Sequence, residues 1–224
     1  LYPMQIDLSI IIPTFNEREN IEILIDRINL LFPDKSKYEI IVVDDDSPDK
    51  TWELVNELSS KQNNIHCIHR TKDKGLSSAI ITGFLAARGT NLAVLDADIQ
   101  HDETLLPKML DKMSEYDLVV GSRMVDDGGV SEDWGVLRKV ISLTATKMAH
   151  LILSINVKDP MSGFFMIKNE AFKEIHPKMN PRGFKTLLEI LYHLKSDKVL
   201  ELGYHFRPRI HGESKLTQKV MVDY

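Results

Sequence analysis

The sequence predicts an α/β protein with a mostly parallel central sheet and helices on both of its faces. Two observations lead to this fold class. Short apolar, β-branched runs alternate along the chain with longer segments whose apolar residues recur at helical spacing. The runs are apolar almost throughout, which is typical of strands covered on both faces. We expect a single domain over residues 1–224, because 43% hydrophobic and 27% charged residues are ordinary for a globular chain of 224 residues.

The first half of the chain is expected to alternate strictly between strands and helices. The first strand ends at Pro13, and the first helix starts at Asn16, with Glu19 three residues later in a capping-box arrangement. Gly89 is the expected stop of the third helix. The expected strands are 8–12, 38–43, 65–69 and 92–95, and the expected helices are 16–32, 47–58 and 75–88.

The second half is expected to be less regular. Residues 126–134 are acidic and contain glycine, which favours a loop. The segment 136–155 is apolar on one face and carries four basic residues or histidines, so it lies on a membrane or packs on the sheet, and both remain open. The expected helices are 105–113, 136–155, 170–175 and 185–194, and the expected extended segments are 118–120, 164–167, 199–203 and 204–210.

Charge and cysteine content exclude several classes of protein. The formal net charge is −5, so nucleic acid is not an expected partner. Cys67 is the single cysteine and allows no disulfide within the chain. No stretch reaches about 18 uncharged apolar residues, so we expect no membrane-spanning helix. Leu1 is not a start methionine, and we expect a fragment or a processed form.

Polar clusters follow three of the expected strands, at 13–17, 44–46 and 96–100. Ligands of open parallel sheets bind beyond the carboxyl ends of the strands, where these clusters would meet. In the stretch LDADIQH, the oxygen-bearing side chains of Asp96, Asp98 and Gln100 alternate, so an extended backbone turns them to one side. Such oxygens suit Mg²⁺ or Mn²⁺, which usually takes one or two carboxylates together with substrate phosphates. A solvated acidic turn is the alternative for a D-x-D pair alone.

Six motifs carry a resemblance to a known family. IIPTFNERENI, VVDDDSPDKT, LDADIQH, GSR, DPMSGFF and HGESKL occur in this order and at this spacing. Over the whole chain they resemble the inverting GT-A glycosyltransferases, and more narrowly the polyprenyl-phosphate glycosyltransferases, such as the dolichol-phosphate mannose synthases. The resemblance implies the GT-A fold, a single Rossmann-like domain. It also implies transfer of mannose from GDP-mannose to a polyprenyl (dolichyl) phosphate, dependent on Mg²⁺ or Mn²⁺.

The resemblance also implies roles for individual residues. Phe15 departs from the tyrosine usual at its position, so a hydroxyl contact with the nucleotide is lost. Asp98 and Gln100 would hold the metal, and Asp45 would accept hydrogen bonds from guanine N–H groups. The catalytic positions would be Asp98, Arg123, between the donor and acceptor phosphates, and Arg138 and Ser142, which would hold the acceptor phosphate. The positions that bind the sugar nucleotide would be Pro13, Phe15, Glu17, Val43, Asp45, Asp96, Ala97, Asp98, Gln100, Arg123, Arg209 and Lys215.

The implied chemistry fits these residue types. A lipid phosphate is an anion at neutral pH, so no strong general base is needed, and cations must offset the charge of the departing diphosphate. Two alternatives remain open: a polyprenyl-phosphate glycosyltransferase using UDP-glucose or another sugar nucleotide, and a non-catalytic subunit that binds nucleotide sugar. The resemblance places the protein at the cytoplasmic face of a membrane. It would be held there peripherally, with a membrane-spanning partner subunit, or by a C-terminal membrane region outside this chain.

Overall fold

A computed structural model describes residues 5–130, 157–180 and 186–210 of the chain. The strands are β1 (Leu8–Thr14), β2 (Tyr38–Asp44), β3 (Ile65–His69), β4 (Asn91–Val94), β5 (Leu118–Ser122), β6 (Gly129–Val130), β7 (Phe165–Lys168), β8 (Val199–Gly203) and β9 (His205–Phe206). The helices are α1 (Arg18–Leu31), α2 (Thr51–Lys61), α3 (Leu76–Ala86), α4 (Leu106–Lys112), α6 (Asn169–Ile175) and α7 (Thr186–Leu194). Two 3₁₀ turns, Glu103–Leu105 and His176–Lys178, precede α4 and follow α6.

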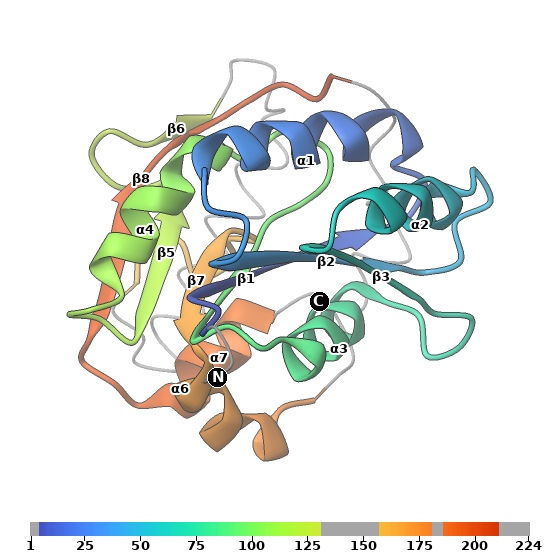
Figure 1. The fold of residues 1–224 in the computed structure, drawn as a ribbon. Helices are drawn as coiled ribbons and strands as arrows, with labels where there is room; N and C mark the ends of the chain where they lie inside the picture. Colours follow the sequence, from blue (N-terminus) through green and yellow to red (C-terminus); the bar gives the residue numbers. More distant parts are fainter. Residues whose placement is uncertain (1–4, 131–156, 181–185, 211–224) are drawn as a thin grey trace, which may run out of the picture.

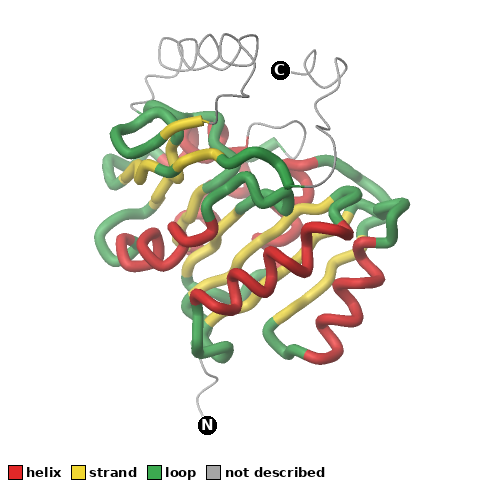
Figure 2. Tube along the Cα trace, turned by 90° about the horizontal axis from the view of Figure 1, so that it is seen from above, coloured by secondary structure: helices red, strands yellow, loops and turns green. Residues whose placement is uncertain are grey.

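Seven strands form one central sheet in the order β3-β2-β1-β4-β7-β5-β8, and β6 pairs with β9 in a small second sheet (Figure 1). β7 runs antiparallel to both of its neighbours, β4 and β5, whereas the other neighbouring strands of the central sheet are parallel. The mostly parallel sheet predicted from the sequence is therefore confirmed. Figure 2 shows most of the loops gathered at the end of the molecule away from the N-terminus.

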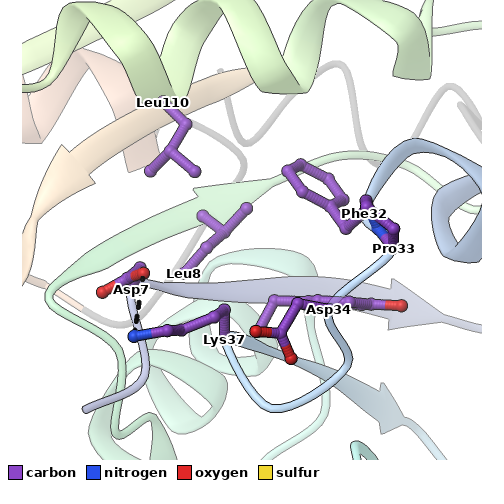
Figure 3. Close-up of a pocket in the computed structure, with 8 residues that line it drawn as sticks. Asp7, Leu8, Phe32, Pro33, Asp34, Lys37 and Leu110 are labelled. Carbon is purple, nitrogen blue, oxygen red and sulfur yellow. Dashed lines mark ion pairs between the residues drawn. The ribbon is translucent and has the colours of Figure 1, made fainter.

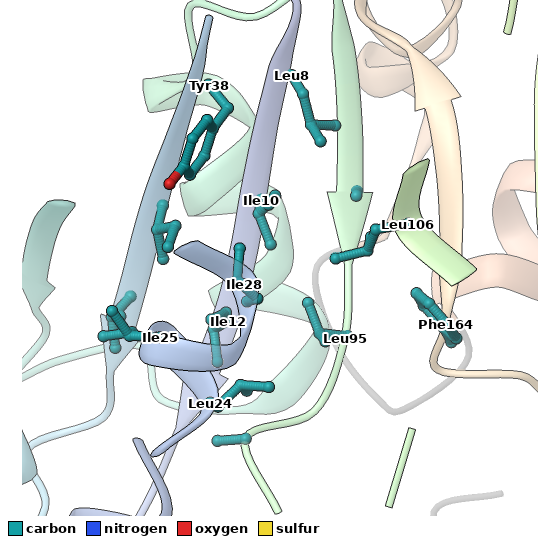
Figure 4. Close-up of a cluster of buried hydrophobic side chains, with 14 of the residues drawn as sticks. Leu8, Ile10, Ile12, Leu24, Ile25, Ile28, Tyr38, Leu95, Leu106 and Phe164 are labelled. Carbon is teal, nitrogen blue, oxygen red and sulfur yellow. The ribbon is translucent and has the colours of Figure 1, made fainter. Parts of the chain in front are cut away.

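Successive strand residues enter two different hydrophobic clusters, because side chains of a strand alternate between its faces. Ile10 and Ile12 lie in the first cluster, with residues of α1, α2 and α4 (Figure 4). Ile11 lies in the second cluster, with residues of α3, α6 and α7. Helices thus cover both faces, as predicted. The apolar part of the buried face of α1 consists of four side chains that are each 0% exposed, and burying each contributes about 1.5–3 kcal/mol to stability: Ile21, Leu24, Ile25 and Ile28.

Helix starts differ from the prediction at two places. α1 begins at Arg18 rather than Asn16, because Asn16 adopts a left-handed backbone with φ of 54° and its side-chain oxygen accepts from the backbone N of Asp49. The expected capping box is therefore wrong. α2 begins at Thr51, and the expected first turn from Ser47 is instead a loop tied to Asp44 by two hydrogen bonds.

The amino ends of β1 and β2 border a shallow pocket (Figure 3). Leu8, Phe32 and Leu110 supply apolar walls, and the ion pair between Lys37 Nζ and Asp7 Oδ2 measures 3.9 Å. This pocket lies at the opposite edge of the sheet from the three polar clusters, so it is not part of the candidate site.

Candidate functional site

The segment after β4 forms a tight acidic turn at the carboxyl edge of the sheet. Ile99, between Asp98 and Gln100, has φ of 63°, which is an outlier for a β-branched residue. Such a conformation costs on the order of 1–3 kcal/mol and persists only where surrounding contacts impose it. Here the Ile99 side chain is buried in the first hydrophobic cluster, and the backbone N of Gln100 donates to Asp98 Oδ1 at 3.2 Å. The fold thus holds the Asp98–Gln100 turn in a fixed shape.

Asp98 is a buried carboxylate whose ionised form is disfavoured by its surroundings. Burial and the neighbouring Asp96 raise the pKa of Asp98, while Arg209 and the backbone N–H of Gln100 act in the opposite direction. Arg209 reaches it from the far end of the described chain, with Nη2 2.6 Å from Asp98 Oδ2. A positive charge at this point therefore stabilises the ionised carboxylate.

Glu17 lies on the other side of Arg209 and joins the first polar cluster to the third. Its Oε1 is 3.8 Å from Arg209 Nη1, and its Oε2 accepts from Asn20 Nδ2 at 2.7 Å. Its backbone N donates to Thr51 Oγ1, which fixes the loop before α1 against α2. The nearby Phe15 side chain is 42% exposed, so it offers an apolar surface to a ligand.

Arg207 anchors the segment that delivers Arg209. Its backbone N donates to the carbonyl of Gln100 at 2.9 Å, and Gln100 Nε2 donates to the carbonyl of Arg207 at 3.0 Å. Its guanidinium binds Glu103 at 2.7 Å and Asp102 at 2.5 Å. From the sequence, Arg207 is only a basic residue in the expected extended segment 204–210, and nothing in its spacing indicates partners about a hundred residues earlier.

The second polar cluster is built around Asp45, directly after β2. Its Oδ1 accepts from Arg70 Nε at 2.8 Å and also from Arg70 Nη2, and its Oδ2 accepts from the backbone N of Gly75 at 2.7 Å. Val43, two residues earlier, is 0% exposed and packs in the second hydrophobic cluster. Its side chain cannot meet a base, so any contact there would use the main chain. The Ala97 side chain is likewise buried, in the first cluster.

Arg123 follows β5 and is held by Asp159. The guanidinium forms a fork to the two carboxylate oxygens at 2.8 and 2.7 Å, and the backbone N of Arg123 donates to the same carboxylate at 3.0 Å. The backbone N of Asp159 in turn donates to Glu201 at 3.0 Å. Burial alone would lower the pKa of Arg123, but Asp159 outweighs it and holds that pKa above its usual range. The motif DPMSG contained this partner, although a turn is the simpler interpretation of an Asp before Pro.

His101 is a buried part of the same edge that sequence reasoning did not identify. Its Nδ1 accepts from the backbone N of Asp96 at 3.0 Å, so the ring proton lies on Nε2, 3.8 Å from Asp96 Oδ2. The ring stacks on Phe164 and meets Tyr204 edge-on. Burial lowers the pKa of His101 to about 4, so the ring is neutral and orients Asp96. A Cβ added to Gly163 would lie 3.4 Å from Asp96 Oδ2, so glycine leaves space beside that carboxylate.

The predicted metal ligands, Asp98 and Gln100, fit a hard divalent cation. They bring oxygen ligands to one turn, and the crowding of Asp96 and Asp98 favours a cation there. Within residues 5–130, 157–180 and 186–210, no group of three or more His, Cys, Asp or Glu side chains could hold a metal by itself. An ion bound here would therefore take further ligands from a phosphate-bearing substrate.

The structure thus brings Glu17, Asp98, Gln100 and Arg209 together. Asp45 and Arg123 follow β2 and β5, which are separated in the sheet by β1, β4 and β7. Pro13 lies in β1, paired in register with Val43 of β2. Arg138, Ser142 and Lys215 lie outside the described residues. No helix in the described ranges has the length and apolar character to cross a membrane.

A family model and similar curated proteins indicate the same family of glycosyltransferases. Residues 9–176 match the family model described as Glycosyl transferase family 2. A dolichol-phosphate mannosyltransferase of Pyrococcus furiosus is 46% identical over 220 residues, which are 97% of this chain and 61% of that protein. A dolichol-phosphate mannosyltransferase of Saccharomyces cerevisiae is 36% identical over 99% of this chain and 85% of that protein. The chain therefore spans about three fifths of the length of the Pyrococcus relative.

Solved structures share the fold. Glucosyl-3-phosphoglycerate synthase of Mycobacterium tuberculosis, in complex with Mn²⁺, UDP-glucose and phosphoglyceric acid, superposes with a TM-score of 0.69 at 18% identity, over 92% of this chain and 72% of that one. Staphylococcus aureus TarS 1–349 in complex with UDP-GlcNAc gives a TM-score of 0.65 at 18% identity, over 93% of this chain and 60% of that one.

Proposed function

This chain belongs to glycosyl transferase family 2, and from that membership we propose that it transfers mannose from GDP-mannose to a polyprenyl phosphate such as dolichyl phosphate. We take residues 1–224 as its catalytic domain. One observation carries the proposal: Glu17, Asp98 and Arg209 converge at the carboxyl edge of the sheet, in a chain that matches dolichol-phosphate mannosyltransferases over nearly its full length.

In the proposed reaction, an oxygen of the lipid phosphate attacks the anomeric carbon of mannose from the face opposite the diphosphate. The new C–O bond forms as the bond to the diphosphate breaks, GDP leaves, and the anomeric configuration inverts. The nucleophile is already an anion, so no side chain has to remove a proton. The buried, neutral His101 is consistent with this, because it holds Asp96 and is closed off from solvent.

The donor half of the site would be built from residues at three strand ends. Asp45 would accept a hydrogen bond from the base, and Pro13, Phe15 and Glu17 would border the nucleotide. Arg209, with Lys215, would bind the diphosphate, for which a guanidinium fork is well suited. Asp98 and Gln100 would hold Mg²⁺ or Mn²⁺, which would offset negative charge on the leaving group. The remaining donor contacts would come from the main chain of Val43 and from Asp96 and Ala97.

The acceptor half would depend on arginines. Arg123, fixed by Asp159, would separate and neutralise the donor and acceptor phosphates, which otherwise repel each other. Arg138 and Ser142 would hold the acceptor phosphate. Since that acceptor is a membrane lipid, we propose that the protein works at the cytoplasmic face of a membrane, alone or with a membrane-spanning partner subunit.

A direct assay tests the proposal. GDP-[¹⁴C]mannose, dolichyl phosphate in detergent and Mn²⁺ are expected to give a labelled product that partitions into chloroform. The Asp98→Asn variant should lose most of this product, whereas Asp7→Asn, at the opposite edge of the sheet, should keep it. UDP-[¹⁴C]glucose in the same assay tests the alternative donor. Folded wild-type protein that labels no lipid from GDP-mannose would overturn the proposal.

A further inference from the structure

Arg70 is committed entirely to holding the carboxylate of Asp45 and the loop beside it. Its Nε and Nη2 donate to Asp45 Oδ1, and Nη2 also donates to the carbonyl of Gly75 at 3.1 Å. Its Nη1 donates to the hydroxyls of Ser78 at 3.0 Å and Thr82 at 3.4 Å. A guanidinium has five N–H donors, and these contacts use all five. Arg70 therefore has no donor left for a ligand, and its effect on one must pass through Asp45.

The same contacts leave Asp45 with little capacity to accept more hydrogen bonds. An ionised carboxylate has about four lone-pair sites. Arg70 uses two of these sites on Oδ1, and the backbone N of Gly75 uses one on Oδ2. One site on Oδ2 remains, on a side chain that is still 12% exposed at the carboxyl edge of the sheet. Asp45 can then offer a ligand one acceptor rather than two.

We propose that Arg70 is a positioning residue for the nucleobase, which restricts Asp45 to a single acceptor for one ring N–H. This inference rests on the proposed function, because it takes Asp45 as the residue that contacts the base. Guanine presents its ring N1–H and its exocyclic 2-amino group side by side, and a carboxylate needs both oxygens to accept from the two. With Oδ1 filled by Arg70, Asp45 binds only N1–H, and the 2-amino group gains nothing from it.

This arrangement selects one class of base. Hypoxanthine, which lacks only the 2-amino group of guanine, keeps the ring N–H and should bind like guanine. Adenine has an acceptor nitrogen at the same ring position, and two acceptors facing each other leave buried polar atoms unpaired. Uracil also carries a ring N–H, at N3, whereas cytosine does not. Asp45 therefore distinguishes bases with a ring N–H from bases without one.

Calorimetric titration with free nucleotides tests the inference. Wild-type protein is expected to bind GDP and IDP with affinities within about threefold of each other, and ADP at least tenfold more weakly. Arg70→Gln and Arg70→Lys remove the fork that holds Asp45 toward the base, so the carboxylate can turn away to solvent, and the ratio of GDP to ADP affinity should fall below about threefold. Asp45→Asn should erase the same ratio.

Arg88 provides a matched control. Its Nε and Nη2 both donate to Glu39 Oε2, at 2.9 and 2.7 Å, so it makes the same kind of fork at the other end of β2, roughly 20 Å away. Arg88→Gln should lower the midpoint of thermal unfolding as Arg70→Gln does, yet keep the wild-type ratio of GDP to ADP affinity. This comparison separates a loss of base selectivity from a general loss of stability.

Two results would overturn the inference while leaving the proposed donor untouched. One is wild-type protein that binds GDP at least tenfold more tightly than IDP, with the difference lost in Asp45→Asn, because both acceptors would then be in use. The other is an Arg70→Gln variant with an unchanged ratio. If UDP binds and GDP does not, GDP-mannose fails as the donor, while the inference is judged on UDP against CDP by the same tenfold and threefold limits. If the folded protein binds no nucleotide, both the inference and the proposed function are overturned.

Discussion

Arg209 and Asp98 form an ion pair of 2.6 Å across 111 positions of the chain, at the point where a divalent cation would be held. Nη1 of the same arginine lies 3.8 Å from Glu17. The guanidinium thus neutralises the two carboxylates, Asp98 and Glu17, at the carboxyl edge of the sheet. When a diphosphate binds together with a divalent cation, the cation would compete with Arg209 for Asp98, and the diphosphate would compete with the carboxylates for Arg209.

We predict that Arg209→Gln raises the affinity for Mn²⁺ in the absence of nucleotide by roughly five- to tenfold, since a partly buried competing charge is worth about 1 kcal/mol. The same variant should bind GDP more weakly, because one charge that would hold the diphosphate is lost. The electron paramagnetic resonance signal of free Mn²⁺ measures the first effect, and calorimetry measures the second.

Lys168→Gln is the control for that experiment, because it breaks the 2.9 Å ion pair with Asp117, which lies at the other end of the sheet from Asp98 and Glu17. It should change neither affinity. Weaker Mn²⁺ binding by Arg209→Gln would show that the arginine assists the ion rather than replacing it.

Arg123→Lys should lower kcat by roughly 100-fold with a smaller change in KM, because a lysine cannot form the fork to both oxygens of Asp159 and would no longer be fixed between two phosphates. Steady-state kinetics with the lipid acceptor measure this split, and circular dichroism checks the fold. A variant in which KM rises while kcat is unchanged would assign Arg123 to binding alone.

Glu39 makes stability depend on pH. Burial would raise its pKa, but hydrogen bonds from Ser9 and from the backbone and guanidinium of Arg88 outweigh burial and lower that pKa below the usual value of 4.5. Its stabilising contribution is therefore complete above about pH 4.5 and is lost as the pH falls through the lower folded-state pKa. Glu39→Gln should be less stable at pH 7 by about 1–3 kcal/mol and should lose less stability between pH 6 and pH 3.

Urea unfolding at pH 7, 6, 4.5 and 3 measures that difference for Glu39→Gln and wild type. Parallel curves of unfolding free energy against pH would show that other carboxylates, rather than Glu39, govern acid unfolding.

The thiol of Cys67 should react slowly in the folded protein. Burial, together with Asp44, raises the pKa of Cys67 to about 12. Because the thiolate is the reactive form, alkylation by iodoacetamide at pH 8 should be roughly a thousandfold slower than in denaturant. Intact mass measured over time gives both rates, and equal rates would show that the partial burial of Cys67 does not protect its thiol.

The sequence predicted local features well and distant partners poorly. Continuous apolar runs predicted the strands, and the cluster at 96–100 was correctly placed directly after one of them. The extended backbone expected for Asp96, Asp98 and Gln100 was wrong, because β4 ends at Val94 and Ile99 adopts a left-handed turn with φ of 63°. The antiparallel direction of β7 and the partners of Arg70 and Arg207 depend on how distant segments pack, and periodicity carries no information about that. The start of α1 was misjudged because the Asn16 side chain binds Asp49 of another loop, which overrides its local capping preference.

The two hydrogen bonds between Gln100 and Arg207 also limit how far Arg209 can travel. They pin the backbone at Arg207, so only Pro208 and Arg209 itself can swing, and two extended residues reach about 7 Å. Pro208 stiffens that short arm further, since its ring fixes one backbone torsion. Any exchange of Arg209 between the acidic turn and a bound phosphate must therefore be a short local rotation.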